Sequence, residues 1–173
     1  MSEARRLWIE GPVGKLECAL RVAMNPRAAA VLAHPHPLYG GTLENPVVFH
    51  ADRALHRTGV TTLRFNFRGV GKSDGLHDEG RGEVRDVGAA LSWLRGLAPG
   101  APLLLVGYSF GAWCALGHAL EEPSSAAFIG IGLPVRSYSF TGLPALRRPW
   151  AVVQGTEDEL GTLGEVRALL ALL

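Results

Sequence analysis

The chain is poor in features that mark several classes of protein. Its 173 residues include only two cysteines, carry a formal net charge of +1 and contain no apolar run near the roughly 20 residues that span a bilayer. A balanced charge favours no nucleic-acid partner, and the short apolar runs predict no membrane segment and no secretion signal. We therefore expect a cytoplasmic protein that binds neither nucleic acid nor a membrane.

The two cysteines, Cys18 and Cys114, are too few for a disulfide framework. Their spacing matches no metal-binding or redox motif, so catalytic cysteine chemistry is not favoured. We expect two buried thiols in a reducing compartment.

Short apolar runs alternate with segments of helical period along most of the chain. This alternation predicts an α/β fold with a mostly parallel, doubly wound sheet, and the first two strands should form an antiparallel edge. Residues 133–149 show no clear period and should be irregular. We expect one domain over residues 1–173, with strands near 7–9, 16–22, 29–33, 60–65, 103–106, 126–131 and 150–153, and helices near 46–58, 83–97, 110–120 and 163–173.

One serine stands between two glycines where a buried-looking strand meets a helix, in Gly107-Tyr108-Ser109-Phe110-Gly111. Gly-x-Ser-x-Gly alone is a weak signal in a glycine-rich chain. A strand before it and a helix after it are the setting of a nucleophile elbow, in which a strained serine is exposed at the carboxyl edge of the sheet. The alternative is a glycine-rich turn with an ordinary capping serine.

Two other strands end in segments that suit the same chemistry. His34-Pro35-His36-Pro37 follows the strand near 29–33. Because proline has no N–H, the backbone of His36, or failing that Leu38, would join the N–H of Phe110 in binding an oxyanion.

The strand near 150–153 runs into Gly155-Thr156-Glu157-Asp158-Glu159. A carboxylate here, for which we choose Asp158, could orient an imidazole. A solvated acidic loop is the alternative.

Four motifs together resemble the α/β-hydrolase family, and within it small, lidless bacterial hydrolases loosely related to dienelactone hydrolases. The similarity extends from about residue 16 to residue 160 and implies a serine nucleophile at Ser109, an acid at Asp158 and an oxyanion loop around His36. It also implies hydrolysis of a small acyl substrate with no metal and no cofactor. The motifs are HPHPLYGGT at 34–42, LRFNFRGVGKSDG at 63–75, GYSFGA at 107–112 and QGTED at 154–158.

The chain departs from this family in one respect: no histidine follows Asp158. The family places its catalytic histidine after the acid, so we expect the last strand and helix of the fold to be missing and the domain to be C-terminally short. Either this sequence is incomplete or the protein ends early. If 173 residues is the true length, strand 150–153 would be an open edge, and open edges favour pairing, here as a homodimer.

Any substitute base must come from earlier in the chain. His34 is one candidate surrogate, although we expect it to shape the loop by hydrogen bonding, and His36 is the other candidate. His77 should lie in a solvent-exposed loop. The remaining histidines, which are His50, His56 and His118, are expected to be packed or surface residues.

The sequence therefore favours a serine hydrolase that cleaves a small ester or related acyl substrate through an acyl-enzyme. The alternative is an inactive protein of the same fold with a binding or assembly role. A nucleotide-binding α/β protein has little support, because neither phosphate-loop pattern is present.

Overall fold

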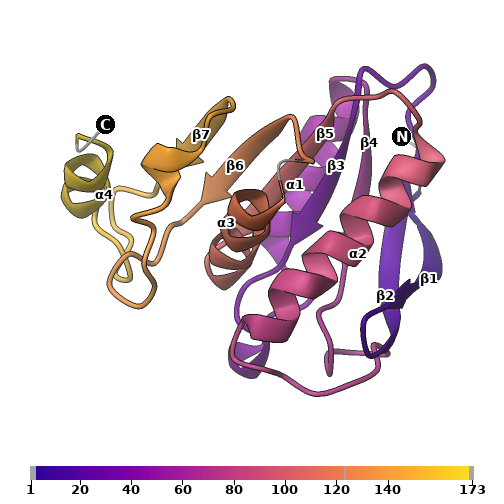
Figure 1. Ribbon diagram of the computed structural model, residues 1–173, viewed down its shortest axis with the longest axis horizontal. Coiled ribbons are helices and arrows are strands. Elements are labelled where there is room, and N and C mark those ends of the chain that lie inside the picture. Colours follow the sequence, from indigo (N-terminus) through magenta and orange to yellow (C-terminus); the bar gives the residue numbers. More distant parts are fainter. Residues whose placement is uncertain (1–2, 123, 172–173) are drawn as a thin grey trace.

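The computed structural model describes residues 3–122 and 124–171, which form a seven-stranded sheet flanked by helices (Figure 1). The strand order is β1-β2-β4-β3-β5-β6-β7, in which β2 is antiparallel to β1 and to β4 and all other neighbours are parallel. The antiparallel N-terminal edge is thus confirmed. The strands are β1 (Arg5–Gly11), β2 (Gly14–Arg21), β3 (Ala28–Ala33), β4 (Val60–Phe65), β5 (Leu103–Tyr108), β6 (Ala127–Ile131) and β7 (Trp150–Val153).

Helices cover both faces of the sheet, which explains why β3 is an uninterrupted apolar run. Helix α1 (Pro46–Arg57) packs on one face, whereas α2 (Arg81–Leu97) and α3 (Phe110–Glu121) lie on the other, in front of the sheet in Figure 1. No helix in the described part of the chain is long and apolar enough to cross a membrane.

The ends of the elements differ slightly from the expected ones. Helix α4 (Leu163–Leu170) ends at Leu170 rather than continuing to Leu173, which lies outside the described residues. A capping box between Thr162 and Glu165 fixes its start. Residues 133–149 are irregular as expected, apart from a short 3₁₀ turn at Leu143–Ala145.

The parallel strands bring their carboxyl ends to one edge of the sheet. Ala33 of β3 lies beside Gly107 of β5, and Gly107 lies beside Gly130 of β6. Ile131 of β6 in turn lies beside Val153 of β7. The segments that follow β3, β5 and β7 therefore all begin at the same edge, and these segments contain every candidate site residue.

Candidate active site

Ser109 occupies a strained backbone position between β5 and α3. Its φ of 55° and ψ of −120° lie in a region that residues with a side chain rarely adopt. Its N–H donates to the carbonyl of Ile131 at 2.9 Å, which ties the turn to the end of β6. The side chain is half-buried rather than enclosed in the core, so the hydroxyl can be reached from the surface.

The two flanking glycines are required by close backbone packing. A Cβ on Gly107 would lie 2.3 Å from the carbonyl oxygen of Gly111, and a Cβ on Gly111 would lie 2.4 Å from that of Ala33. Real Cβ atoms do not approach backbone so closely, so only glycine allows this strand, turn and helix to pack together. The sequence pattern thus has a steric cause in the structure.

The first turn of α3 supplies N–H groups beside Ser109. Phe110 is the first residue of the helix, where backbone N–H groups have no partner within the helix. The positive end of the helix dipole favours negative charge at the same place. The Phe110 ring is buried against Phe67 and Trp113, with centroids 5.7 and 5.9 Å away, which anchors the turn.

The loop after β3 is held by His34. Its Nε2 accepts the N–H of Phe67 at 3.1 Å, so Nδ1 carries the proton and donates to the carbonyl of Pro35 at 2.6 Å. Burial lowers the pKa of His34 to about 4, against the opposing effect of the Pro35 hydrogen bond. Both ring nitrogens are therefore committed to backbone, which favours the loop-shaping role over that of a surrogate base.

The next part of this loop folds back on His36. The N–H groups of Tyr39 and Gly41 both donate to the His36 carbonyl, at 3.1 Å each, around the 3₁₀ turn η1 (Pro37–Tyr39). The Leu38 N–H donates to the His36 ring and is already engaged. The backbone N–H of His36 has no acceptor among residues 3–122 and 124–171. It is therefore a better candidate oxyanion donor than the N–H of Leu38.

Asp158 lies at the same edge of the sheet as Ser109. Its Oδ2 accepts from the side chain of Gln154 at 3.1 Å, and its Oδ1 accepts from the N–H of Leu160 at 3.0 Å. The carboxylate is also close to Gly132, just past β6. It is half-buried, and its oxygens keep acceptor capacity for a further donor such as an imidazole N–H.

A cavity of about 660 Å³ opens between the loop after β3 and the segment after β6. Ser109 and His36 both line it, together with Tyr39, Tyr108 and Tyr138. Its lining residues are Pro35, His36, Tyr39, Asn45, Tyr108, Ser109, Pro134, Ser137, Tyr138 and Leu160.

Comparison with known proteins matches the family described as the alpha/beta hydrolase fold over residues 38–158 of this chain. The chain belongs to the α/β-hydrolase family. A curated relative, the uncharacterized protein RP471 of Rickettsia prowazekii, is 40% identical over 95% of this chain and 71% of its own length.

Two solved structures of α/β serine hydrolases superpose on the whole sheet. XC6422 from Xanthomonas campestris, described as a serine hydrolase without lid, is 35% identical with a TM-score of 0.89, over 100% of this chain and 80% of its own. A serine hydrolase homologue from Coxiella burnetii is 37% identical with a TM-score of 0.91, over 99% of this chain and 83% of its own. The expected fold class and its lidless subgroup are therefore confirmed.

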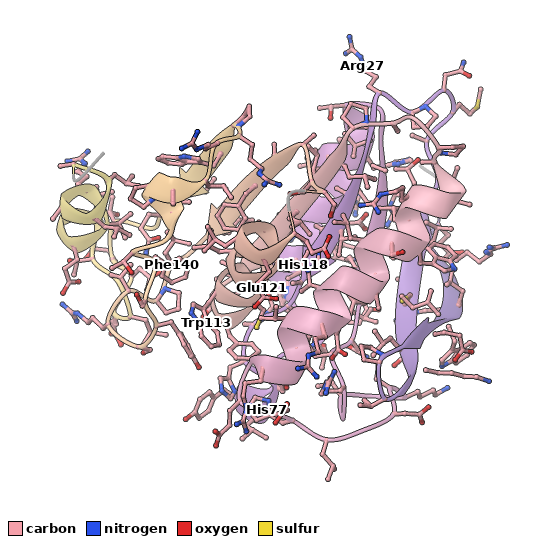
Figure 2. The ribbon with its side chains drawn as sticks, viewed as in Figure 1. Arg27, His77, Trp113, His118, Glu121 and Phe140 are labelled. Carbon is pink, nitrogen blue, oxygen red and sulfur yellow. The ribbon has the colours of Figure 1, made fainter. Side chains whose placement is uncertain are left out.

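The histidines of this α/β hydrolase are spread over the molecule, and among the six only His36 lines the cavity with Ser109. His50 is exposed on α1, and the His56 ring lies near the carbonyl of Val60. His118 is buried between α2 and α3 against Gly88 (Figure 2).

The prediction that His77 lies in a solvent-exposed loop is wrong. Its side chain is only 15% exposed, and its Nδ1 lies 2.8 Å from the fully buried Glu83 carboxylate. Figure 2 shows it at the lower edge of the molecule, near the start of α2. Glu83 also accepts the N–H groups of Asp78 and Gly80, so it caps α2 and holds the loop. In the sequence, Glu83 stands three residues after Gly80, a spacing typical of the start of a helix. This spacing was the available signal that the loop containing His77 is held against the start of α2.

The two cysteines do not belong to the site. Both are free and buried, and burial raises the pKa of the Cys18 thiol to about 12 and that of Cys114 well above its usual value. They are therefore protonated thiols rather than nucleophiles. No group of side chains suited to a metal ion occurs among the described residues.

Proposed function

We propose that this α/β hydrolase is a serine hydrolase that cleaves a small ester or a related acyl compound through an acyl-enzyme. The observation that carries the proposal is the position of Ser109. It combines a positive φ at a strand-to-helix turn, a half-buried hydroxyl and an opening onto a cavity beside two candidate N–H donors.

In the proposed reaction the Oγ of Ser109 attacks the acyl carbonyl carbon, and the resulting oxyanion is bound by the N–H groups of Phe110 and His36. Collapse of this intermediate breaks the bond to the leaving group, which departs with a proton, and water then releases the acid from Ser109. Each N–H donor to an oxyanion is worth about 10²–10³ in rate.

The Ser109 proton needs an acceptor, and Asp158 is placed to orient one. In the family this acceptor is a histidine that follows the acid, and the sequence has none after Asp158. Within the described residues His34 has no free ring nitrogen to offer. Without a base, a serine nucleophile keeps only the roughly 10³–10⁴-fold advantage over water that comes from the oxyanion donors and binding.

The exposed edge strand β7 suits a second candidate function, in binding or assembly. An inactive protein that keeps the fold for binding or assembly would show the same cavity and the same turn around Ser109. We propose for assembly a homodimer through β7, which is the outermost strand of the described sheet and whose Val153 is 58% exposed. Light scattering of wild type and Val153→Lys would test it, since a monomer for both would contradict the homodimer.

We retain the cytoplasm as the proposed location, supported by the two free, buried thiols. The tyrosine-rich wall and the size of the cavity favour a small acyl compound with an apolar or aromatic group.

Turnover of p-nitrophenyl acetate separates the two functions. The wild type is expected to hydrolyse it and Ser109→Ala to fall to the background rate. Ser92→Ala is a matched control, because Ser92 is exposed on α2 and does not line the cavity, and it should stay within about threefold of wild type. A folded wild-type protein with no turnover above background would support the inactive candidate.

A further inference from the structure

The side chain of His36 contacts three aromatic rings and one backbone N–H group. Its ring packs against Tyr39, His77 and Phe110, with centroid distances of 4.8, 4.9 and 4.8 Å. Its Nδ1 accepts the N–H of Leu38 at 3.2 Å and so caps the 3₁₀ turn that follows. The imidazole therefore joins the loop after β3 to the first turn of α3.

This cap depends on the protonation state of the ring. A neutral imidazole can accept a hydrogen bond at Nδ1 only if its proton is on Nε2. When the ring takes up a second proton, both nitrogens become donors. The Nδ1–H then faces the Leu38 N–H, and the hydrogen bond between them is lost. Asn, Asp and Ser are the usual caps, and none of them loses its acceptor in this way near neutral pH.

The same residue fixes the direction of the candidate oxyanion donor. The His36 carbonyl accepts from both Tyr39 and Gly41, so the turn closes on the His36 backbone. A Cβ on Gly41 would lie 2.1 Å from the carbonyl oxygen of Pro35, which shows how tightly the loop is folded. Loss of the cap would free the turn and with it the orientation of the His36 N–H.

We infer that the His36 imidazole is a positioning residue, whose neutral ring caps the oxyanion loop and whose protonation releases it, so that acid weakens oxyanion binding at Ser109. This inference rests on the proposed function for its effect on catalysis, but the cap itself can be observed without any reaction.

Burial and the charged groups near the ring together set the pH at which the cap is lost. Burial is the largest cause that lowers the pKa of His36, the electrostatic influence of His77 lowers it further, and the Glu83 carboxylate of α2 opposes both. Tyr39 on the same turn and Tyr138, which lines the same cavity and contacts Phe110, are further titratable groups nearby. Because the pKa of His36 is lowered from its usual value of about 6.5, the cap is kept at neutral pH and lost only below it.

Nuclear magnetic resonance of the whole chain tests the cap directly. At pH 7 the His36 ring should carry its proton on Nε2, and on acidification the Leu38 amide should shift together with the His36 ring signals. In His77→Asn both should titrate at higher pH, since the positive neighbour is gone. If the chemical shift of the Leu38 amide does not change with pH, or if the ring carries its proton on Nδ1 at pH 7, the inference is overturned whatever the activity.

The rate of labelling by a fluorophosphonate between pH 4.5 and 8 tests the catalytic consequence. Wild type should lose rate in acid in step with His36, and His36→Ala should be slower at pH 7 by about tenfold. His36→Asn keeps an acceptor that does not titrate, so it should label faster than His36→Ala and lose less of its rate in acid than wild type. His50→Asn, at an exposed histidine of α1, should follow wild type.

The two tests distinguish the possible failures. If wild type is never labelled but its Leu38 amide titrates with His36, the proposed function is contradicted, whereas the inference that the His36 ring caps the turn still holds. An acid loss that persists unchanged in His36→Asn would overturn the catalytic role of the ring.

Discussion

Replacing Gly111 by alanine probes the packing on which the site depends. The added Cβ would lie 2.4 Å from the carbonyl oxygen of Ala33 and 2.5 Å from that of His34. Both contacts are to backbone at the end of β3, so no side chain can rotate away and the strand and helix must separate. Overpacking of a closed core costs about 1–3 kcal/mol, and we expect a loss of unfolding free energy at or above the upper end of this range.

Urea unfolding of wild type, Gly111→Ala and Gly96→Ala measures this loss against a matched control. Gly96 is an exposed glycine of α2, and a Cβ there would meet nothing within 4 Å. Alanine at that position should therefore stabilise the protein by about 0.5–1 kcal/mol, because glycine is the poorer helix former. A Gly111→Ala protein as stable as wild type, with unchanged fluorophosphonate labelling, would refute the steric account of the elbow.

Three further predictions concern strain and buried charge. Ser109→Gly should be about 1 kcal/mol more stable than Ser109→Ala in urea unfolding, because only glycine relieves the positive φ; equal stabilities would argue against strain. The unfolding free energy of wild type should fall by about 3 kcal/mol between pH 6.5 and 4. The pKa of buried His34 is about 4 in the folded protein and about 6.5 in the unfolded chain. As the pH falls, the unfolded chain therefore binds the proton first, which favours unfolding. His34→Gln should flatten this fall, and a parallel pH dependence in the variant would contradict it. Asp86→Ala should cost about 3–5 kcal/mol by calorimetry or urea, because it leaves the buried Arg68 guanidinium without the carboxylate it holds at 2.7 and 3.0 Å; a cost under 1 kcal/mol would count against the pair.

Much of the fold could be predicted from the sequence, because the strands that position the site are buried on both faces. Val31 and Leu105 lie in short apolar runs that end at glycine, proline or polar residues, and such runs are typical of central parallel strands. The glycines around Ser109 were informative because a strand–turn–helix setting can be read from local sequence, although the contact that requires Gly111 is with the end of β3.

Contacts between loops could not be predicted in the same way. His77 and His36 are far apart in sequence, and their packing on Phe110 depends on how two loops fold over the end of the sheet. The Nδ1 cap from His36 to Leu38 is local, but histidine is not a usual cap residue, so the residue pattern did not indicate it. The end of α4 differs by a few residues, as helix ends commonly do.

The most direct test of the account is to find where a fluorophosphonate attaches. Wild-type protein treated with the reagent should gain the mass of one phosphonyl group, and peptide mapping should assign it to the peptide that contains Ser109, with no adduct in Ser109→Ala. An adduct at Ser137 or another residue, or a folded protein that gains no mass at any reagent concentration, would contradict the central claim that Ser109 is an activated nucleophile.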